Sequence, residues 1–268
     1  MPDFQELGRP AIAGLAAIAL LAVATWVVSS VRHNVAYVDR VWSLLFIAAA
    51  LVYAGTSTSA GPRTGWLLGL LIVWGLRLSI HITWRGWGHE EDRRYQAIRR
   101  RNQPNFALKS LLIVFGLQAL LAWLISAPLL AGIASRQGLN GLDAAGITLC
   151  VFGIGYEALA DWQLLRFQAD PSTRGRVMDR GLWCHSRHPN YFGECCTWWG
   201  FFLIALAAGA AWTIVSPLMM TVLLLKVSGV ALLEKDIGER RPGYREYVRS
   251  TNAFFPGPRK SLPTETRS

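Results

Sequence analysis

Residues 179–194 place a dense group of polar side chains directly before an apolar run, residues 195–211. The segment reads Asp-Arg-Gly-Leu-Trp-Cys-His-Ser-Arg-His-Pro-Asn-Tyr-Phe-Gly-Glu. Its arginines can hold phosphate oxygens bidentately, its histidines, asparagine and tyrosine can donate hydrogen bonds, and its glutamate can accept them. Polar groups this dense occur within a membrane only where they line a cavity. The segment therefore predicts a ligand site at the mouth of a membrane helix.

The composition of the chain is that of a membrane protein. Of its 268 residues, 52% are hydrophobic and 16% are charged, whereas a soluble domain usually carries about 25% charged residues. Its 12 tryptophans and 7 tyrosines are of the types that gather at membrane interfaces. The first apolar run is long and has no basic segment before it, so we expect a retained membrane helix rather than a cleaved signal peptide. We predict an all-α integral membrane protein.

Seven apolar runs reach or approach the roughly 20 residues that a membrane helix needs. They are residues 10–31, 38–55, 65–84, 106–133, 142–160, 194–210 and 211–233. When these seven transmembrane helices are threaded through a bilayer, most of the 27 lysines and arginines fall on the side that holds the C-terminal tail. The positive-inside rule then places the N-terminus out and the C-terminus in. This placement accounts for the net charge of +10, so no nucleic-acid partner is expected.

We expect a single membrane domain, residues 1–256, followed by a disordered cytosolic tail, residues 257–268. Neither a metal site nor a disulfide is expected. The pair His185-x-x-His188 lacks the acid of the zinc hydrolases, and the four cysteines form no Cys-x-x-Cys pair.

Acidic and aromatic residues near residues 179–194 complement its arginines. Glu157 and Glu194 can accept hydrogen bonds from ribose hydroxyls or from an amide. Asp161 is expected at the end of the fifth helix, where the helix dipole disfavours an acid, and this favours a functional role. Trp183 or a neighbouring tyrosine can stack on an adenine-type ring. Together these residues predict a site for a large, anionic nucleotide cofactor on the cytosolic side.

The same residues carry a family resemblance. Arg180-Gly-Leu-Trp183, followed by Ser186-Arg-His-Pro-Asn-Tyr-Phe-Gly-Glu194, resembles the membrane reductases of the steroid 5-alpha-reductase family, above all a bacterial branch once described only as a domain of unknown function. The upstream residues Glu157-x-x-x-Asp161-x-Gln163 with Arg166-Phe167, and the tail Tyr244-Arg-Glu-Tyr247 with Phe254-Phe-Pro256, are also similar to that branch. The resemblance spans most of the chain and is more specific from about residue 150.

The resemblance implies an enzyme in a bacterial inner membrane: a seven-helix bundle that holds NADPH from the cytosolic side. Such an enzyme reduces the carbon–carbon double bond of a 3-oxo-4-ene steroid or similar enone lipid, so its partners are that substrate and membrane lipids. The cofactor-binding residues expected from the resemblance and from residue type are Glu157, Asp161, Arg166, Arg174, Arg187, His188, Asn190, Tyr191, Glu194, Trp198, Glu234 and Lys235.

The chain departs from the animal steroid reductases in its catalytic residues. Those enzymes carry a Gln-Glu pair on the second helix and a tyrosine on the third for the substrate carbonyl. Here Gln5-Glu6 precedes the first helix, and the second helix begins with Tyr37 and Asp39. We therefore predict Asp39 and Tyr37 as the acid that assists at the carbonyl while hydride reaches the beta carbon. The plain alternative is that Asp39 is a favourable helix-start residue.

Two other functions fit parts of the pattern. Methyltransferases that use S-adenosylmethionine, of the isoprenylcysteine carboxyl methyltransferase type, share Arg-His-Pro followed by Tyr and a similar tail. Asn190 and Glu194, together with the Asp161/Arg166 block, favour the reductase. A non-catalytic lipid-binding or transport protein would use the arginines for headgroups, but anionic headgroups would be repelled by the acids at positions 157, 161 and 194.

Overall fold

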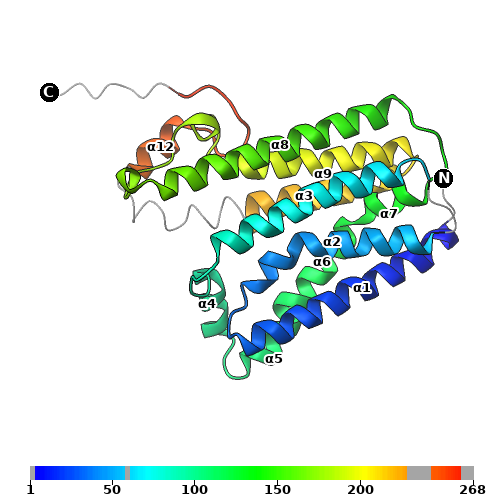
Figure 1. Ribbon diagram of the computed structural model, residues 1–268, viewed down its shortest axis with the longest axis horizontal. Coiled ribbons are helices and arrows are strands. Elements are labelled where there is room, and N and C mark those ends of the chain that lie inside the picture. Colours follow the sequence, from blue (N-terminus) through cyan, green and yellow to red (C-terminus); the bar gives the residue numbers. More distant parts are fainter. Residues whose placement is uncertain (1–3, 58–60, 228–242, 261–268) are drawn as a thin grey trace. The chain divides into compact units, whose positions relative to one another are not determined.

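A computed structural model describes residues 4–57, 61–227 and 243–260, and every regular element in these ranges is a helix (Figure 1). The chain divides into two compact units, Met1–Ile147 with Phe201–Ser216, and Thr148–Gly200 with Pro217–Ser268. The prediction of an all-helical protein is confirmed for the described part of the chain.

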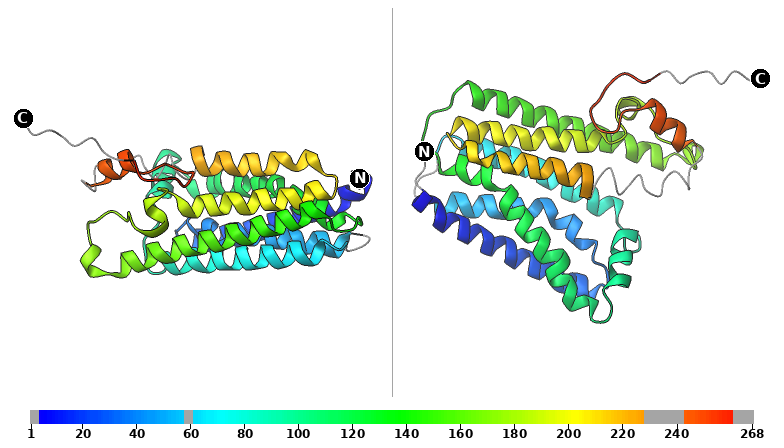
Figure 2. Two further views of the ribbon diagram at one scale, coloured as in Figure 1. Left: turned by 90° about the horizontal axis from the view of Figure 1, so that it is seen from above. Right: turned by 180° about the vertical axis from the view of Figure 1, so that it is seen from behind.

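The first unit is built on an antiparallel series of long helices. They are α1 (Phe4–Val31), α2 (Tyr37–Thr56), α3 (Thr64–Arg85), the short α4 (Arg93–Arg101), and a broken helix formed by α5 (Phe106–Ser110), η1 (Leu111–Gly116), α6 (Leu117–Ile125) and α7 (Ala127–Ala134). Helix α2 packs between α1 and α3, and α6 and α7 lie against α1 and α2 (Figures 1 and 2). Ala49 and Ala50 on α2 are fully buried. Small side chains such as these allow helices in lipid to approach each other closely.

Five helices are long and apolar enough to cross a membrane: Glu6–Val31, Tyr37–Thr56, Thr64–Arg85, Phe106–Ala134 and Gly141–Ala169. They coincide with the first five predicted spans, so the prediction of an integral membrane protein is confirmed. The sixth predicted span, residues 194–210, overlaps helix α9 (Pro189–Ala207), which begins five residues earlier. The seventh contains η4 (Ala211–Ile214), α10 (Val215–Val222) and η5 (Leu223–Val227), and its predicted end at position 233 lies outside the described residues.

The expected position of Asp161 at the end of a helix is wrong. Helix α8 runs from Gly141 to Ala169, so Asp161 lies more than two turns before its C-terminus. The polar residues after position 160 end the apolar run but contain no helix breaker. The helix stops where Asp170 precedes Pro171, because a proline disfavours helical geometry in the residue before it. Asp161 therefore belongs to a helix face and not to a loop.

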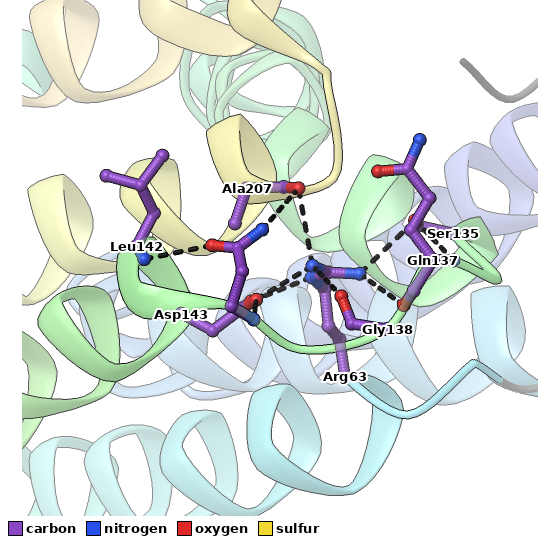
Figure 3. Close-up of polar contacts among 8 residues, drawn as sticks. Arg63, Ser135, Gln137, Gly138, Leu142, Asp143 and Ala207 are labelled. Carbon is purple, nitrogen blue, oxygen red and sulfur yellow. Dashed lines mark hydrogen bonds and ion pairs between the residues drawn. The ribbon is translucent and has the colours of Figure 1, made fainter.

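A buried ion pair joins several connections of the first unit (Figure 3). Arg63 Nε and Nη2 donate to the two carboxylate oxygens of Asp143 at 2.7 Å each, and neither residue is more than 1% exposed. The remaining guanidinium donors reach the carbonyls of Gln137 at 2.8 Å, Gly138 at 3.0 Å and Ala207 at 3.3 Å. Because the guanidinium and the carboxylate are both fully hydrogen-bonded, the pair satisfies the condition under which a buried charge is tolerated.

Candidate functional site

The second unit is organised by a close crossing of α8 and α9 (Figures 1 and 2). A Cβ at Gly153 would lie 2.6 Å from the carbonyl oxygen of Gly193, and a Cβ at Gly193 would lie 2.6 Å from the backbone nitrogen of Glu157. No side chain fits at either position, so only glycine lets the two backbones touch. The crossing places Glu157 directly beside the first turns of α9.

Three residues with carboxyl groups are buried at this crossing. Glu157 and Asp161 share one face of α8 because they are four residues apart, and they are 2% and 4% exposed. Glu194 on α9 is 7% exposed. Acidic residues are almost never buried unless they are paired, and in a membrane protein a buried ionisable group marks a functional site by default. This acidic cluster, Glu157, Asp161 and Glu194, is the centre of the candidate site.

Asn190 extends the acidic cluster from the first turn of α9. Its Nδ2 donates to Oδ1 of Asp161 at 3.1 Å. Its Oδ1 is buried and has no hydrogen-bond partner among the described residues. Buried polar atoms are nearly always hydrogen-bonded, so an unpaired amide oxygen here is suited to an N–H or O–H donor of a ligand. Trp198, fully buried, follows Glu194 one turn further along α9.

The loop between α8 and α9 folds back onto α8. Gly181 adopts a φ of +58°, which favours glycine, and the next residue, Leu182, donates its backbone N–H to Oε1 of Gln163 at 2.9 Å. The indole N–H of Trp183 donates to the carbonyl of Ala160 at 3.0 Å, and Trp183 is 8% exposed. Trp183 therefore fixes the loop on the helix rather than offering an open face for stacking.

The C-terminal segment, residues 243–260, lies across this loop and is called the strap. It contains α12 (Tyr244–Ser250). Tyr247 Oη donates to the carbonyl of Trp183 at 2.5 Å, and Ser186 Oγ donates to the carbonyl of Phe254 at 2.8 Å. The strap and the loop thus hold each other through backbone carbonyls.

Arg187 is the main link between the loop and the strap. Its Nη1 donates to the carbonyls of Val248 at 3.1 Å and Thr251 at 2.6 Å, and its backbone nitrogen donates to the carbonyl of Asn252 at 2.9 Å. A cation at these positions satisfies the open carbonyls at the end of α12 and opposes the negative end of the helix dipole. The structure gives Arg187 this capping role, and the cofactor contact expected for it stays a prediction.

The other predicted cofactor residues occupy distinct surroundings. His188 is 5% exposed and stacks its ring on that of Tyr191, with the planes 3° apart. Arg166 is exposed and lies 5.0 Å above the ring of Trp162, and Arg174 is exposed in the loop. Glu234 and Lys235 lie outside the described residues.

The two predicted catalytic residues, Asp39 and Tyr37, contact different partners. Oδ1 of Asp39 accepts a hydrogen bond from the hydroxyl of Tyr95 at 2.6 Å, and Oδ2 accepts one from Nη2 of Arg94 at 3.1 Å. Tyr37 lies instead beneath the guanidinium of Arg40, 4.4 Å from it. Residues two apart on a helix face different directions, which separates Tyr37 from Asp39. The structure therefore joins Asp39 to Tyr95, which sequence analysis missed.

The charges around Asp39 define its role in this arrangement. Burial, and then the charge and hydrogen bond of Asp39, raise the pKa of Tyr95 well above its usual value. Burial opposes the charge of Arg94, but the carboxylates of Asp39 and Asp92 outweigh it and raise the pKa of Arg94. Tyr95 thus keeps its proton and Arg94 keeps its charge at neutral pH. Both donate to Asp39, which is therefore an acceptor in this arrangement, and its predicted role as the acid stays a prediction.

Fold and site together define an all-helical membrane protein with a buried acidic cluster beside a polar loop. The chain belongs to the family described as proteins of unknown function, DUF1295, which it matches over residues 25–251. This range includes the acidic cluster, Asn190 and the Asp39–Tyr95 pair. An uncharacterized protein of Schizosaccharomyces pombe is 27% identical over 285 residues, covering 95% of this chain and 82% of that protein. No solved structure matches the chain.

Proposed function

We propose that the protein is an NADPH-dependent reductase of the carbon–carbon double bond in a 3-oxo-4-ene steroid or similar enone lipid. The observation that carries this proposal is the acidic cluster with Asn190 at the α8–α9 crossing, in a chain whose loop resembles the steroid 5-alpha-reductase family. NADPH, when bound, would supply the hydride for the beta carbon. Membership of the DUF1295 family is consistent with that resemblance.

The residues present suit the parts of such a cofactor. The unpaired Oδ1 of Asn190 can accept from a carboxamide or amino N–H. Glu157 and Glu194 can accept from ribose hydroxyls. The exposed guanidinium groups of Arg166 and Arg174 can pair with phosphate oxygens in bidentate fashion. The buried cluster thus offers acceptors for hydroxyl and amide groups, and the exposed arginines offer cations for phosphates.

Asp39 and Tyr37 remain the proposed residues for assistance at the carbonyl, and Tyr95 joins them. Tyr95 keeps its proton and donates it to Asp39 in this structure, so we propose that the substrate carbonyl takes this hydrogen bond in place of Asp39. Such a donor stabilises the negative charge that develops on a carbonyl oxygen as the double bond is reduced.

We also propose seven membrane spans with the N-terminus outside, in a bacterial inner membrane, and the cofactor side in the cytoplasm. The five long apolar helices support this, together with α9 and the shorter apolar helix Ala211–Lys226. The test is an Arg100→Cys variant, in which the four native cysteines are replaced by serine. Labelling of intact cells by a membrane-impermeant maleimide would contradict the orientation, and labelling only after lysis would support it.

A second candidate is a methyltransferase that uses S-adenosylmethionine. Buried carboxyl groups would favour its sulfonium cation, which is the specific observation in its support. The two are separated by titrating detergent-solubilised protein with NADPH and with S-adenosylmethionine and following the melting temperature, which rises when a ligand binds the native state. The reductase is supported by a rise with NADPH that Asn190→Ala weakens and Asn102→Ala, an amide control at the C-cap of α4, does not. A rise with S-adenosylmethionine alone would replace it.

A further inference from the structure

An apolar groove at the C-terminal end of α3 has no place in the proposed reaction. Ser79, Ile80, Thr83, Trp84 and Trp87 line it, and its volume is about 320 Å³. That volume lies at the lower end of the range for small-molecule sites. All five residues belong to the last turns of one membrane span or the turn after it, so the groove is a surface feature of a single helix end.

The walls of the groove are unusually exposed for their size. Trp84 is 76% exposed, Trp87 73% and Ile80 61%. Val73 and Leu76, about two turns earlier on α3, are exposed as well and continue the same apolar face along the span. Tryptophan at the end of a membrane helix sits at the level of the lipid headgroups, with its ring against the acyl chains. The groove therefore opens where a lipid headgroup meets its chains.

Positive charge follows this groove directly in the sequence, although Arg85 is not one of the residues that line it. Arg85 follows Trp84 directly, is exposed, and makes no ion pair among the described residues. The segment from position 85 to 101 contains six arginines against three acids. Two of the acids are already engaged, since Glu91 pairs with Arg99 at 2.7 Å and Asp92 with Arg94 at 3.0 Å. The charge of Asp92 also reaches Arg85, but the arginines outnumber the acids, so the net charge of this segment is cationic.

We propose that this end of α3 binds one anionic phospholipid, with an acyl chain in the groove between Trp84 and Ile80 and the phosphate against Arg85. An apolar groove on a membrane span selects a hydrocarbon chain, and a cation at the interface selects an anionic headgroup. Each basic residue near the surface contributes about 1 kcal/mol to such binding, which corresponds to roughly fivefold in affinity. The site does not depend on the reaction proposed above.

The test counts bound lipids by native mass spectrometry while delipidated protein in detergent is titrated with phosphatidylglycerol and, separately, phosphatidylcholine. We expect about fivefold tighter binding of phosphatidylglycerol. Arg85→Gln should remove that preference, whereas Arg100→Gln, an equal loss of charge on α4, should retain it. Trp84→Ala combined with Trp87→Ala should weaken both lipids, and Trp66→Ala, at the other end of α3, should weaken neither.

Three results would overturn the site. Equal losses in Arg85→Gln and Arg100→Gln would show diffuse attraction to the segment. An unchanged preference in Arg85→Gln would remove the phosphate contact. Displacement of phosphatidylglycerol by a 3-oxo-4-ene steroid would assign the groove to a substrate. Melting temperatures of all variants are measured first, and the Arg85 comparison stands alone if the double tryptophan variant does not fold.

Discussion

Nδ2 of Asn190 donates a hydrogen bond to Oδ1 of Asp161 over 3.1 Å, which fastens the first turn of α9 to the interior of α8. The same asparagine leaves its Oδ1 buried and without a partner among the described residues. One side chain thus secures the helix crossing with its amide nitrogen and presents an acceptor with its amide oxygen.

This relationship predicts different effects for changes to its two ends. Asp161→Ala should lower the melting temperature, because it removes the acceptor of the hydrogen bond from Asn190, which contributes about 0.5 to 1.5 kcal/mol. Asn190→Asp keeps the size of the side chain but places a second carboxylate beside Asp161, so it should weaken NADPH binding at least tenfold. Thermal shift with and without NADPH measures both. Wild-type affinity in Asn190→Asp would remove Asn190 from the cofactor site.

We predict that Arg187 stabilises the strap even when no ligand is bound. Arg187→Ala leaves the carbonyls of Val248 and Thr251 without a cation, so we expect faster hydrogen exchange at residues 244–252 in the absence of NADPH. Arg187→Lys should restore part of the protection. If exchange of the strap is unchanged while NADPH affinity falls, Arg187 contacts the cofactor directly.

The strap should loosen in alkali. Burial raises the pKa of Tyr247 above its usual value of about 10. The folded state therefore favours the protonated phenol, and the stabilisation is complete below pH 10 and falls as the pH rises from there towards the folded-state pKa. The melting temperature of the wild type should drop between pH 9 and about 11 more steeply than that of Tyr247→Phe. Parallel curves for the two proteins would show that Tyr247 is not the responsible group.

The Asp39–Tyr95 pair predicts a distinctive pattern in turnover. If Tyr95 turns its single hydroxyl proton from Asp39 to the substrate carbonyl, Tyr95→Phe and Asp39→Asn should each lower kcat for an enone steroid about 10²-fold or more, with NADPH affinity unchanged. Their combination should lower kcat little further, because the two residues form one unit. A large loss in Asp39→Asn with normal turnover in Tyr95→Phe would assign the donor role to Asp39 itself. Tyr37→Phe tests the role predicted for Tyr37 separately, and it should lower kcat if the Tyr37 hydroxyl assists at the carbonyl.

The buried ion pair of Arg63 and Asp143 predicts strongly non-additive stability effects. Arg63→Ala leaves Asp143 buried without its cation, which should cost about 3 to 5 kcal/mol in unfolding free energy. Arg63→Met combined with Asp143→Leu removes both charges and should cost less than either single change. Unfolding in mixed micelles of SDS and a mild detergent measures all the variants. Additive losses would show that the two side chains do not depend on each other.

The apolar spans could be predicted because length and hydrophobicity alone decide whether a helix crosses a membrane. The three residues of the acidic cluster and Asn190 could be proposed from their types. Their contact depends on Gly153 and Gly193, which let two backbones meet, and no periodicity in the sequence encodes that. Asp39 and Tyr95 are 56 residues apart, and their link depends on how α4 turns back beneath α2. The sequence offers one signal for Tyr95: together with Ile98 it is an apolar residue in the arginine-rich segment 93–101.

Arg187 shows the opposite difficulty. Its type and neighbours suited a phosphate ligand, yet its partners are backbone carbonyls of the strap, and backbone partners leave no trace in residue type. The end of α8 was predicted too early for a related reason. Asp161 and Gln163 are polar and suggest the end of the helix, although polar residues alone do not break a helix. The breaker, Asp170-Pro171, was visible in the sequence.

The ion pair of Arg63 also imposes an order on biogenesis. Asp143 lies 80 residues after Arg63, and the carbonyl of Ala207 that completes the cage lies 144 residues after it. A ribosome therefore delivers α1, α2 and α3 to the membrane long before the partners of Arg63 exist. Until α8 emerges, the guanidinium lacks Asp143 and must stay hydrated at the bilayer surface. Closure of that end of the first unit is thus timed by synthesis of α8 and not by insertion of the early helices.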